Sequence, residues 1–301
     1  MPASPVLGFV GLGVMGEPMC RNLARKSGSP VLAFDLRPEP LQRASEDGVE
    51  SAASLADLVA RADVIFLSLP SENEVRAVAL GADGIAAHVR AGQTVVDTST
   101  CPVPLAQELA DAFGGKGVAF ADAPVARTAQ AARDGTLAIM VGGDSEIFER
   151  IRPFLACMGE EITHCGRVGA GQAVKLMNNM IVAETVHAIA EALAIARASG
   201  VVDGKVLFET LTKGSADSFV LRNHGLKSML PDTHPTGGFP VRYILKDLSY
   251  ALRLAESCGI TPEGAHAARR VLERAEAMGF GDRYYTVAVK AYEAESEQKS
   301  S

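Results

Sequence analysis

The sequence predicts two domains: an α/β domain with a parallel sheet covered by helices, followed by an all-α domain, the two joined by a long helix. The first observation is that short apolar runs alternate with helical segments between residues 5 and 164. The second is that this alternation stops near residue 169, after which almost every segment has a helical period. We therefore expect one domain over residues 1–165 and a second over residues 166–301.

Strands and helices can be assigned in order along the chain. In the first domain, strands are expected at residues 5–10, 30–34, 64–69, 94–97, 118–121, 137–141 and 161–164, and helices at residues 15–26, 37–47, 55–61, 72–80, 103–112 and 144–158. A loop is expected between the fifth and sixth of these strands. In the second domain, helices are expected at residues 172–199, 204–213, 219–229, 243–258 and 262–278, with glycine and proline between them.

A glycine-rich turn, Gly11-Leu12-Gly13-Val14-Met15-Gly16, joins the first expected strand to the first expected helix. Gly11 permits the tight turn, Gly13 lets a pyrophosphate approach the backbone, and Gly16 lets the helix pack closely on the strand. Free N–H groups and the helix dipole favour an anion at this helix N-terminus. Asp35 ends the second strand, where an acid binds the adenosine ribose hydroxyls. The pattern predicts a Rossmann-type dinucleotide-binding domain.

Asp35 also bears on which dinucleotide binds. Its carboxylate would repel the 2′-phosphate of NADP and would accept hydrogen bonds from both ribose hydroxyls of NAD. Arg37, two residues later, could partly offset that repulsion. We therefore expect NAD as the cofactor, with NADP possible.

Composition argues against several kinds of partner. The net charge is −7, so no field attracts nucleic acid or anionic lipid. The most apolar helical stretch is interrupted by Glu184, Glu191 and Arg197, which suits a buried helix better than a membrane span. The chain begins with a strand rather than a basic and then apolar leader. We expect a cytoplasmic protein without a nucleic-acid or membrane partner.

Cysteines and histidines show no pattern of a disulfide framework or a metal site. The five cysteines are odd in number and lack a CxxC pair, as expected of reduced thiols in a cytoplasm. The six histidines lack HxxxH and HExxH spacing, so no metal is expected.

A second group of polar residues opens the long helix. Gly171-Gln172 leads into Lys175 and Asn179, which lie four residues apart and therefore share a helix face. Burying an unpaired ammonium is expensive, so this lysine is either exposed to solvent or part of a site. Beside a nicotinamide, partial burial would lower the lysine's pKa and let it donate a proton to a carbonyl oxygen.

Together these segments resemble the β-hydroxyacid dehydrogenase family, which includes 3-hydroxyisobutyrate dehydrogenase and related semialdehyde reductases. The matching stretches follow the family's order: residues 9–19 with Asn22, Asp97-Thr98-Ser99-Thr100, Asp122-Ala123-Pro124-Val125, Gly135-Thr136-Leu137, Gly171-Gln172 with Lys175 and Asn179, and Lys246-Asp247-Leu248. The resemblance therefore spans both expected domains.

The resemblance implies a role for individual residues. Lys175 would be the catalytic acid/base, Asn179 would hold the substrate and fix the lysine, and Ser99 would hydrogen-bond the substrate's acid group. The implied cofactor-binding residues are Gly11, Gly13, Val14, Met15, Gly16, Asp35, Arg37, Leu69, Pro70, Thr98, Phe239 and Lys246. A plainer alternative makes Phe239 a core side chain and Lys246 half of a surface ion pair with Asp247.

The chain departs from the family in the loop after Val125. Most relatives continue with Ser-Gly-Gly, whereas this chain has Ala126-Arg127-Thr128. Two glycines are lost, and Arg127 brings a planar fork of donors suited to a carboxylate, phosphate or sulfonate. The Arg-Thr pair is similar to that of sulfolactaldehyde reductases in the same family. This implies that Arg127 and Thr128 bind a substrate anion; the alternative is a surface arginine that points away.

We expect hydride transfer between a small anionic hydroxy acid and its aldehyde or semialdehyde, with Lys175 handling the hydroxyl proton. Specific reduction of sulfolactaldehyde is one alternative, and a catalytically inactive dinucleotide-binding sensor is another. Retention of Lys175, Asn179 and Ser99 argues against the sensor. A methyltransferase would leave the helical half unexplained. The resemblance also implies assembly through long helices, as a homodimer or homotetramer.

Overall fold

The computed structural model describes residues 4–300, with side chains through residue 295. The chain divides into two compact units, residues 1–175 and 176–301. The sequence places the boundary at residue 165, whereas this division falls inside the long helix α9 (Ala170–Ser199). The α/β first unit and the helical second unit confirm the expected fold class.

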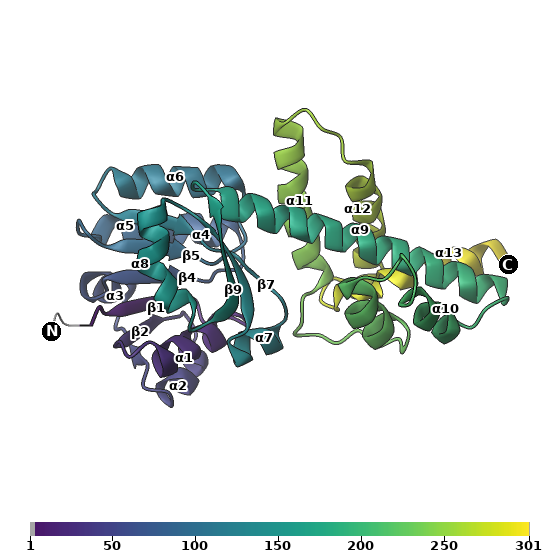
Figure 1. Ribbon diagram of the computed structural model, residues 1–301, viewed down its shortest axis with the longest axis horizontal. Coiled ribbons are helices and arrows are strands. Elements are labelled where there is room, and N and C mark those ends of the chain that lie inside the picture. The colour runs from purple at the N-terminus through teal and green to yellow at the C-terminus, as the bar shows by residue number, and fades with distance from the viewer. Residues whose placement is uncertain (1–3, 301) are drawn as a thin grey trace. The chain divides into compact units, whose positions relative to one another are not determined.

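A nine-stranded sheet forms the centre of the first unit (Figure 1). Its strands are β1 (Leu7–Val10), β2 (Val31–Phe34), β3 (Glu50–Ser51), β4 (Val64–Leu67), β5 (Thr94–Asp97), β6 (Ala119–Asp122), β7 (Val125–Ala126), β8 (Leu137–Gly142) and β9 (Gly159–Gly166). Strands β3-β2-β1-β4-β5-β6 are parallel neighbours in that order, followed by β8 and β7, and β9 pairs with β8. The first six strands thus have the order of a doubly wound dinucleotide-binding sheet.

The parallel sheet that the sequence predicts holds for β3-β2-β1-β4-β5-β6, and the sheet becomes mixed beyond β6. Only Ala123 and Pro124 separate β6 from β7, and both strands pair with β8 in one antiparallel register, because the chain reverses direction between β7 and β8. The expected loop therefore contains β7 and a short helix, α7 (Ala129–Asp134). Elements this short give no clear hydrophobic period, which is why the sequence did not reveal them.

Helices cover both faces of the sheet. They are α1 (Gly16–Lys26), α2 (Pro38–Ser45), α3 (Leu55–Arg61), α4 (Glu72–Leu80), α5 (Ile85–His88), α6 (Val103–Gly114) and α8 (Ser145–Leu155). Side chains of β4 alternate between two apolar clusters, because successive strand residues point to opposite faces. Val64 and Phe66 pack with α1 and α8, whereas Ile65 and Leu67 pack with α3 to α6. In doubly wound sheets, ligands bind outside the carboxyl ends of the strands.

The second unit is helical. Its elements after α9 are α10 (Gly204–Leu211), η1 (Leu221–Met229), α11 (Val241–Ser257), α12 (Glu263–Ala275), η2 (Glu276–Phe280), η3 (Tyr285–Ala288) and α13 (Val289–Ser300). Ala183, Val186, Ala190 and Leu193 lie on one face of α9 and are buried in the core of this unit. By length and composition α9 could cross a membrane, a test that a buried core helix also passes.

Candidate active site

The glycine-rich turn has the geometry that its sequence predicts. Gly11 has φ +92°, and a Cβ there would collide with the carbonyl oxygen of Ser68. A Cβ on Gly16 would collide with the carbonyl oxygen of Gly11, so strand and helix approach closely only because both residues are glycine. A Cβ on Gly13 would meet nothing within 4 Å. The backbone at Gly13 therefore has open space beside it.

The N-terminus of α1 suits a pyrophosphate. Met15 is its N-cap residue and makes no side-chain capping hydrogen bond, so the first N–H groups of α1 lack that partner. Such groups, together with the helix dipole, favour an anion. Val14 in the same turn is exposed. The chain here fits the dinucleotide that the sequence implies, and the contacts of Val14, Met15 and the three glycines with it stay predictions.

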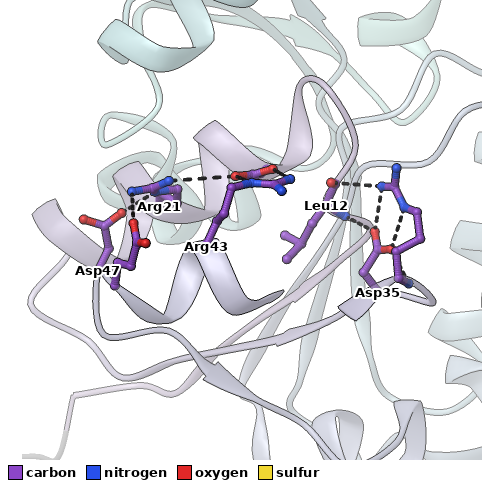
Figure 2. A network of polar contacts seen from close by, with 8 residues as sticks. Leu12, Arg21, Asp35, Arg43 and Asp47 are labelled. Atoms are coloured by element: carbon purple, nitrogen blue, oxygen red, sulfur yellow. Dashed lines mark hydrogen bonds and ion pairs between the residues drawn. The ribbon is translucent and has the colours of Figure 1, made fainter. Parts of the chain in front are cut away.

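Asp35 is held by the glycine-rich turn itself (Figure 2). Its Oδ2 accepts a hydrogen bond from the backbone N–H of Leu12 at 2.6 Å, and its Oδ1 accepts from the backbone N–H of Arg37 at 2.9 Å and from Arg37 Nε at 3.1 Å. Burial alone would raise the pKa of Asp35, but the hydrogen bonds from Arg37 and Leu12 outweigh it and lower that pKa. Asp35 is therefore an anion, and Arg37 is its partner.

The ends of β4 and β5 meet around Ser99. The backbone N–H of Leu69 donates to Ser99 Oγ at 2.9 Å, and the N–H of Ser99 donates to Asp97 Oδ1 at 2.9 Å. Thr98 Oγ1 donates to the carbonyl oxygen of Leu67 at 2.5 Å. Leu69, Thr98 and Ser99, assigned separately from the sequence, thus lie together, and Pro70 follows Leu69 directly.

Gln172 and Asp122 join this group, although neither has a role predicted from the sequence. Gln172 Nε2 donates to the carbonyl oxygen of Ser99 at 2.8 Å, and its Oε1 accepts from the N–H of Cys101 at 2.9 Å. Asp122 accepts hydrogen bonds from the N–H groups of Gly169 and Gln172 at 2.7 and 2.8 Å. A polar residue in an otherwise apolar stretch was the signal that could have identified them: Gln172 in the first turn of α9 and Asp122 at the end of β6.

Lys175 and Asn179 lie one turn apart on α9. Only 9% of Lys175 and 6% of Asn179 is exposed, so the alternative of a solvent-exposed lysine is wrong. In the second unit, Asn179 Nδ2 donates to Asp247 Oδ2 at 2.6 Å. The Nδ2 of Asn178 donates to Asn179 Oδ1 at 2.9 Å. Asn179 is therefore fixed by two neighbours.

Lys246 lies beside Asp247 and two aromatic rings. Its Nζ is 3.2 Å from Asp247 Oδ1, and 5.7 and 5.4 Å from the ring centres of Tyr243 and Tyr250. Asp247 is 2% exposed, so the alternative of a surface ion pair is wrong. Phe239 is partly buried and packs edge-on against Tyr243. Its proposed contact with the nicotinamide stays a prediction, as does that of Lys246.

Arg127 adopts a backbone conformation that favours glycine, with φ +86°. Its Nη1 donates to the carbonyl oxygen of Thr136 at 2.5 Å and lies 3.5 Å from Glu160 Oε2. Thr128 Oγ1 accepts from the N–H of Ala131 at 3.3 Å and so caps α7. Arg127 thus has an acidic partner at the start of β9. Substrate binding by Arg127 and Thr128 stays a prediction.

No group of three or more His, Cys, Asp or Glu side chains within the described residues is placed to hold a metal ion. The five cysteines have free thiols.

Comparison with known proteins places the chain in a family. Residues 6–166 match the family model for the NAD binding domain of 6-phosphogluconate dehydrogenase, and residues 169–292 match that for the NAD-binding of NADP-dependent 3-hydroxyisobutyrate dehydrogenase. The chain is 38% identical to 3-hydroxyisobutyrate dehydrogenase of Pseudomonas aeruginosa, over 87% of this chain and 89% of that one. It is 32% identical to 2-(hydroxymethyl)glutarate dehydrogenase of Eubacterium barkeri, over 97% and 96%.

A solved structure agrees with these sequence matches. The structure of Mycobacterium tuberculosis 3-hydroxyisobutyrate dehydrogenase with L-serine superposes with a TM-score of 0.85 at 32% identity, over 95% of this chain and 98% of that one. The sequence motifs, the fold and these relatives agree. The chain belongs to the β-hydroxyacid dehydrogenase family of NAD(P)-dependent oxidoreductases.

Proposed function

We propose that the protein reversibly interconverts a small anionic hydroxy acid and its aldehyde or semialdehyde by NAD-dependent hydride transfer. The observation that carries this proposal is the burial of Lys175 one helical turn after Gln172. Gln172 is bonded to Ser99 at the carboxyl end of β5, and cofactors of doubly wound sheets bind at that edge. A buried lysine near a nicotinamide site has the position that acid/base catalysis requires.

Lys175 is proposed to move the hydroxyl proton. The nicotinamide cofactor, when bound, supplies or accepts the hydride. In the direction of reduction, the Lys175 ammonium donates a proton to the carbonyl oxygen; in the direction of oxidation, its neutral amine removes the proton from the hydroxyl group. Asn179, one turn further along α9, orients the lysine and the substrate. The hydrogen bond to Asp247 fixes the direction in which the Asn179 amide points.

The names of the relatives support a substrate class. 2-(Hydroxymethyl)glutarate, 3-hydroxyisobutyrate and L-serine each carry a hydroxymethyl group on the carbon that bears a carboxylate. We propose that this chain acts on a hydroxymethyl group near an anion, with Ser99 binding the anion. Sulfolactaldehyde is a second candidate, favoured by Arg127 and Thr128 in a loop where other members have glycines.

For the cofactor we propose NAD in preference to NADP. The Asp35 carboxylate, held in place by Leu12, would repel a 2′-phosphate. Arg37 is engaged with Asp35 and would have to leave it to reach that phosphate.

We propose a cytoplasmic homodimer or homotetramer without nucleic-acid or membrane partners. The free thiols suit a reducing compartment. Ile181 and Ile195, both exposed on α9, offer apolar surface for a second copy of the chain.

The proposal is tested by initial rates of NADH oxidation with methylmalonate semialdehyde and with sulfolactaldehyde, on the wild type and on Lys175→Ala. General acid catalysis predicts that Lys175→Ala loses roughly 10²–10⁴-fold in kcat. NADH binding, followed by fluorescence, should be retained. Lys116→Ala, at an exposed lysine of the first unit, is the matched control and should keep wild-type kcat.

The outcomes separate the alternatives. Near-normal turnover by Lys175→Ala would remove Lys175 from the mechanism. A wild type that binds NADH but turns over neither aldehyde, nor the corresponding alcohols with NAD, would support the sensor. A strong preference for the sulfonate that collapses in Arg127→Gly would identify a sulfolactaldehyde reductase.

A further inference from the structure

We infer that Gln172 and Asp122 are positioning residues that tie the first turns of α9 to the loop after β5 and thereby fix Lys175 relative to Ser99. This inference rests on the proposed function, because it assigns residues that hold the catalytic lysine in place. It concerns only contacts within the first unit, from β5 and β6 to the start of α9.

Gln172 makes contacts at three points. Its side-chain amide donates to the carbonyl oxygen of Ser99, its side-chain oxygen accepts from the N–H of Cys101, and its own N–H donates to Asp122. The residue is 0% exposed, so both side-chain atoms depend on these partners. A helix residue is thus bonded to two backbone groups 73 and 71 positions earlier in the chain.

Asp122 binds the backbone N–H groups at the N-terminus of the same helix. Its two carboxylate oxygens accept from Gly169 and Gln172, and an anion at a helix N-terminus is favoured by the free N–H groups and the dipole. Close packing makes this possible. A Cβ on Gly171 would collide with the carbonyl oxygen of Met140 and lie 2.8 Å from Asp122 Oδ2, and one on Gly142 would collide with Oδ1.

The consequence for Lys175 follows from helix geometry. Lys175 is three positions after Gln172, so the lysine lies about one turn further along nearly the same side of α9. Ser99 is also held by Leu69 and Asp97. The hydrogen bond between Gln172 and Ser99 prevents α9 from rotating about its own axis. It therefore also fixes the direction in which the Lys175 side chain projects from the helix. A displacement near 1 Å can cost roughly 10²-fold in rate.

The first unit also supplies a matched control. Gln93 is likewise 0% exposed, donates from Nε2 to the carbonyl oxygens of Val59 and Ala62 at 2.7 Å each, and accepts from the N–H of Arg90 at 2.6 Å. It immediately precedes β5, at the end of the strand opposite Ser99. Gln93→Leu removes the same kinds of hydrogen bond without touching α9.

The experiment compares Gln172→Leu with Gln93→Leu in the full-length protein. We measure kcat with the better aldehyde at saturating NADH, the dissociation constant for NADH, the melting temperature, and the kinetic isotope effect with deuterated NADH. Both variants should melt at lower temperature. Only Gln172→Leu should lose at least about tenfold in kcat and show a larger isotope effect, because misplacing the lysine slows the chemical step. The affinity for NADH should stay within about twofold.

An equal fall of kcat in the two variants, with an unchanged isotope effect, would show that Gln172 acts only through stability. If Gln172→Leu does not fold, Gln172→Glu replaces it. The isosteric carboxylate still accepts the hydrogen bond from the N–H of Cys101, but its second oxygen faces the carbonyl oxygen of Ser99 and cannot donate to it. Normal kcat in that variant would overturn the inference. The proposed function fails in a different way, when the wild type is inactive or Lys175→Ala matches it.

Discussion

Asn179 donates a hydrogen bond from Nδ2 to Asp247 Oδ2 at 2.6 Å, and both side chains are buried in the second unit. The other oxygen of Asp247 lies 3.2 Å from Lys246 Nζ. One carboxylate therefore contacts an amide and an ammonium whose roles the resemblance implied separately. Because Asp247 is 68 positions from Asn179 in the chain, helix α11 sets the orientation of a side chain on α9.

Asp247→Asn should lower turnover, and a change in NADH binding would show that the displaced partner is Lys246 rather than Asn179. In the wild type, one Asp247 oxygen faces the Asn179 amide and the other faces the Lys246 ammonium. Asparagine replaces one of these oxygens with an NH₂ donor, which faces another donor and repels that partner. We expect kcat to fall by roughly 10-fold or more, in line with the loss of a charge-assisted hydrogen bond. Steady-state rates and NADH fluorescence titration measure both quantities. Asp203→Asn, at the N-cap of α10, is the control; equal activity of the two variants would contradict the prediction.

Asp35→Asn should shift cofactor preference toward NADPH. The substitution removes the charge that repels the 2′-phosphate and releases Arg37 to pair with it. The ratio of kcat/KM for NADPH to that for NADH should rise by at least about tenfold. A tenfold change corresponds to about 1.4 kcal/mol, the size of one ordinary charged contact. Asp63→Asn breaks a similar pair with Arg90 elsewhere in the first unit and should leave the ratio unchanged. A ratio that moves equally in both variants would argue against a local effect.

Arg127→Gly should preserve or increase stability while weakening substrate binding. Glycine adopts φ +86° without a Cβ penalty, a gain of about 1 kcal/mol that offsets the lost contacts with Thr136 and Glu160. If Arg127 binds the substrate anion, the KM for the aldehyde substrate should rise at least about tenfold. Glu160→Gln provides the opposite test: it frees the guanidinium from its acidic partner and should lower KM. An unchanged KM in both variants would make Arg127 a surface residue.

Asp97 and Asp122 should make the protein less stable as pH rises. Burial raises the pKa of each carboxyl group from 3.8 to about 6. The folded chain therefore holds protons that the unfolded chain has released, so this stabilisation is complete below the unfolded pKa and is lost as pH rises through about 6. Each group contributes up to about 3 kcal/mol.

Urea denaturation between pH 4 and 7.5 measures this dependence, with the free energy of unfolding extrapolated to zero denaturant. Asp97→Asn removes one of the two titrating groups and should flatten the curve. A curve with the wild-type slope would show that Asp97 titrates with the same pKa in the folded and unfolded chains. Asp63→Asn serves again as the control, because the hydrogen bond with Arg90 lowers the pKa of Asp63 rather than raising it.

Local patterns predicted much of the fold because their physical cause is local. Gly11, Gly13 and Gly16 fix a strand–turn–helix by backbone sterics alone, and the structure has that turn. Helices such as residues 55–61 and 72–80 have the bounds expected from the sequence, and in the structure Ser54 and Ser71 cap their N-termini. The short β7 and α7 were missed, since their pairing with β8 and α1 depends on contacts rather than on periodicity.

The sequence by itself determined the fold class, the dinucleotide turn and Lys175 and Asn179 as candidates, because motif spacing and periodicity are properties of nearby residues. Ser99 became a candidate through the family resemblance of the sequence. Only the tertiary structure decided that Asp35 is bonded to Leu12, that Gln172 is bonded to Ser99, and that Asp247 holds Asn179. These hydrogen bonds join residues far apart in the chain. Their geometry exists only once the sheet has aligned the strand ends and each unit has closed around its core.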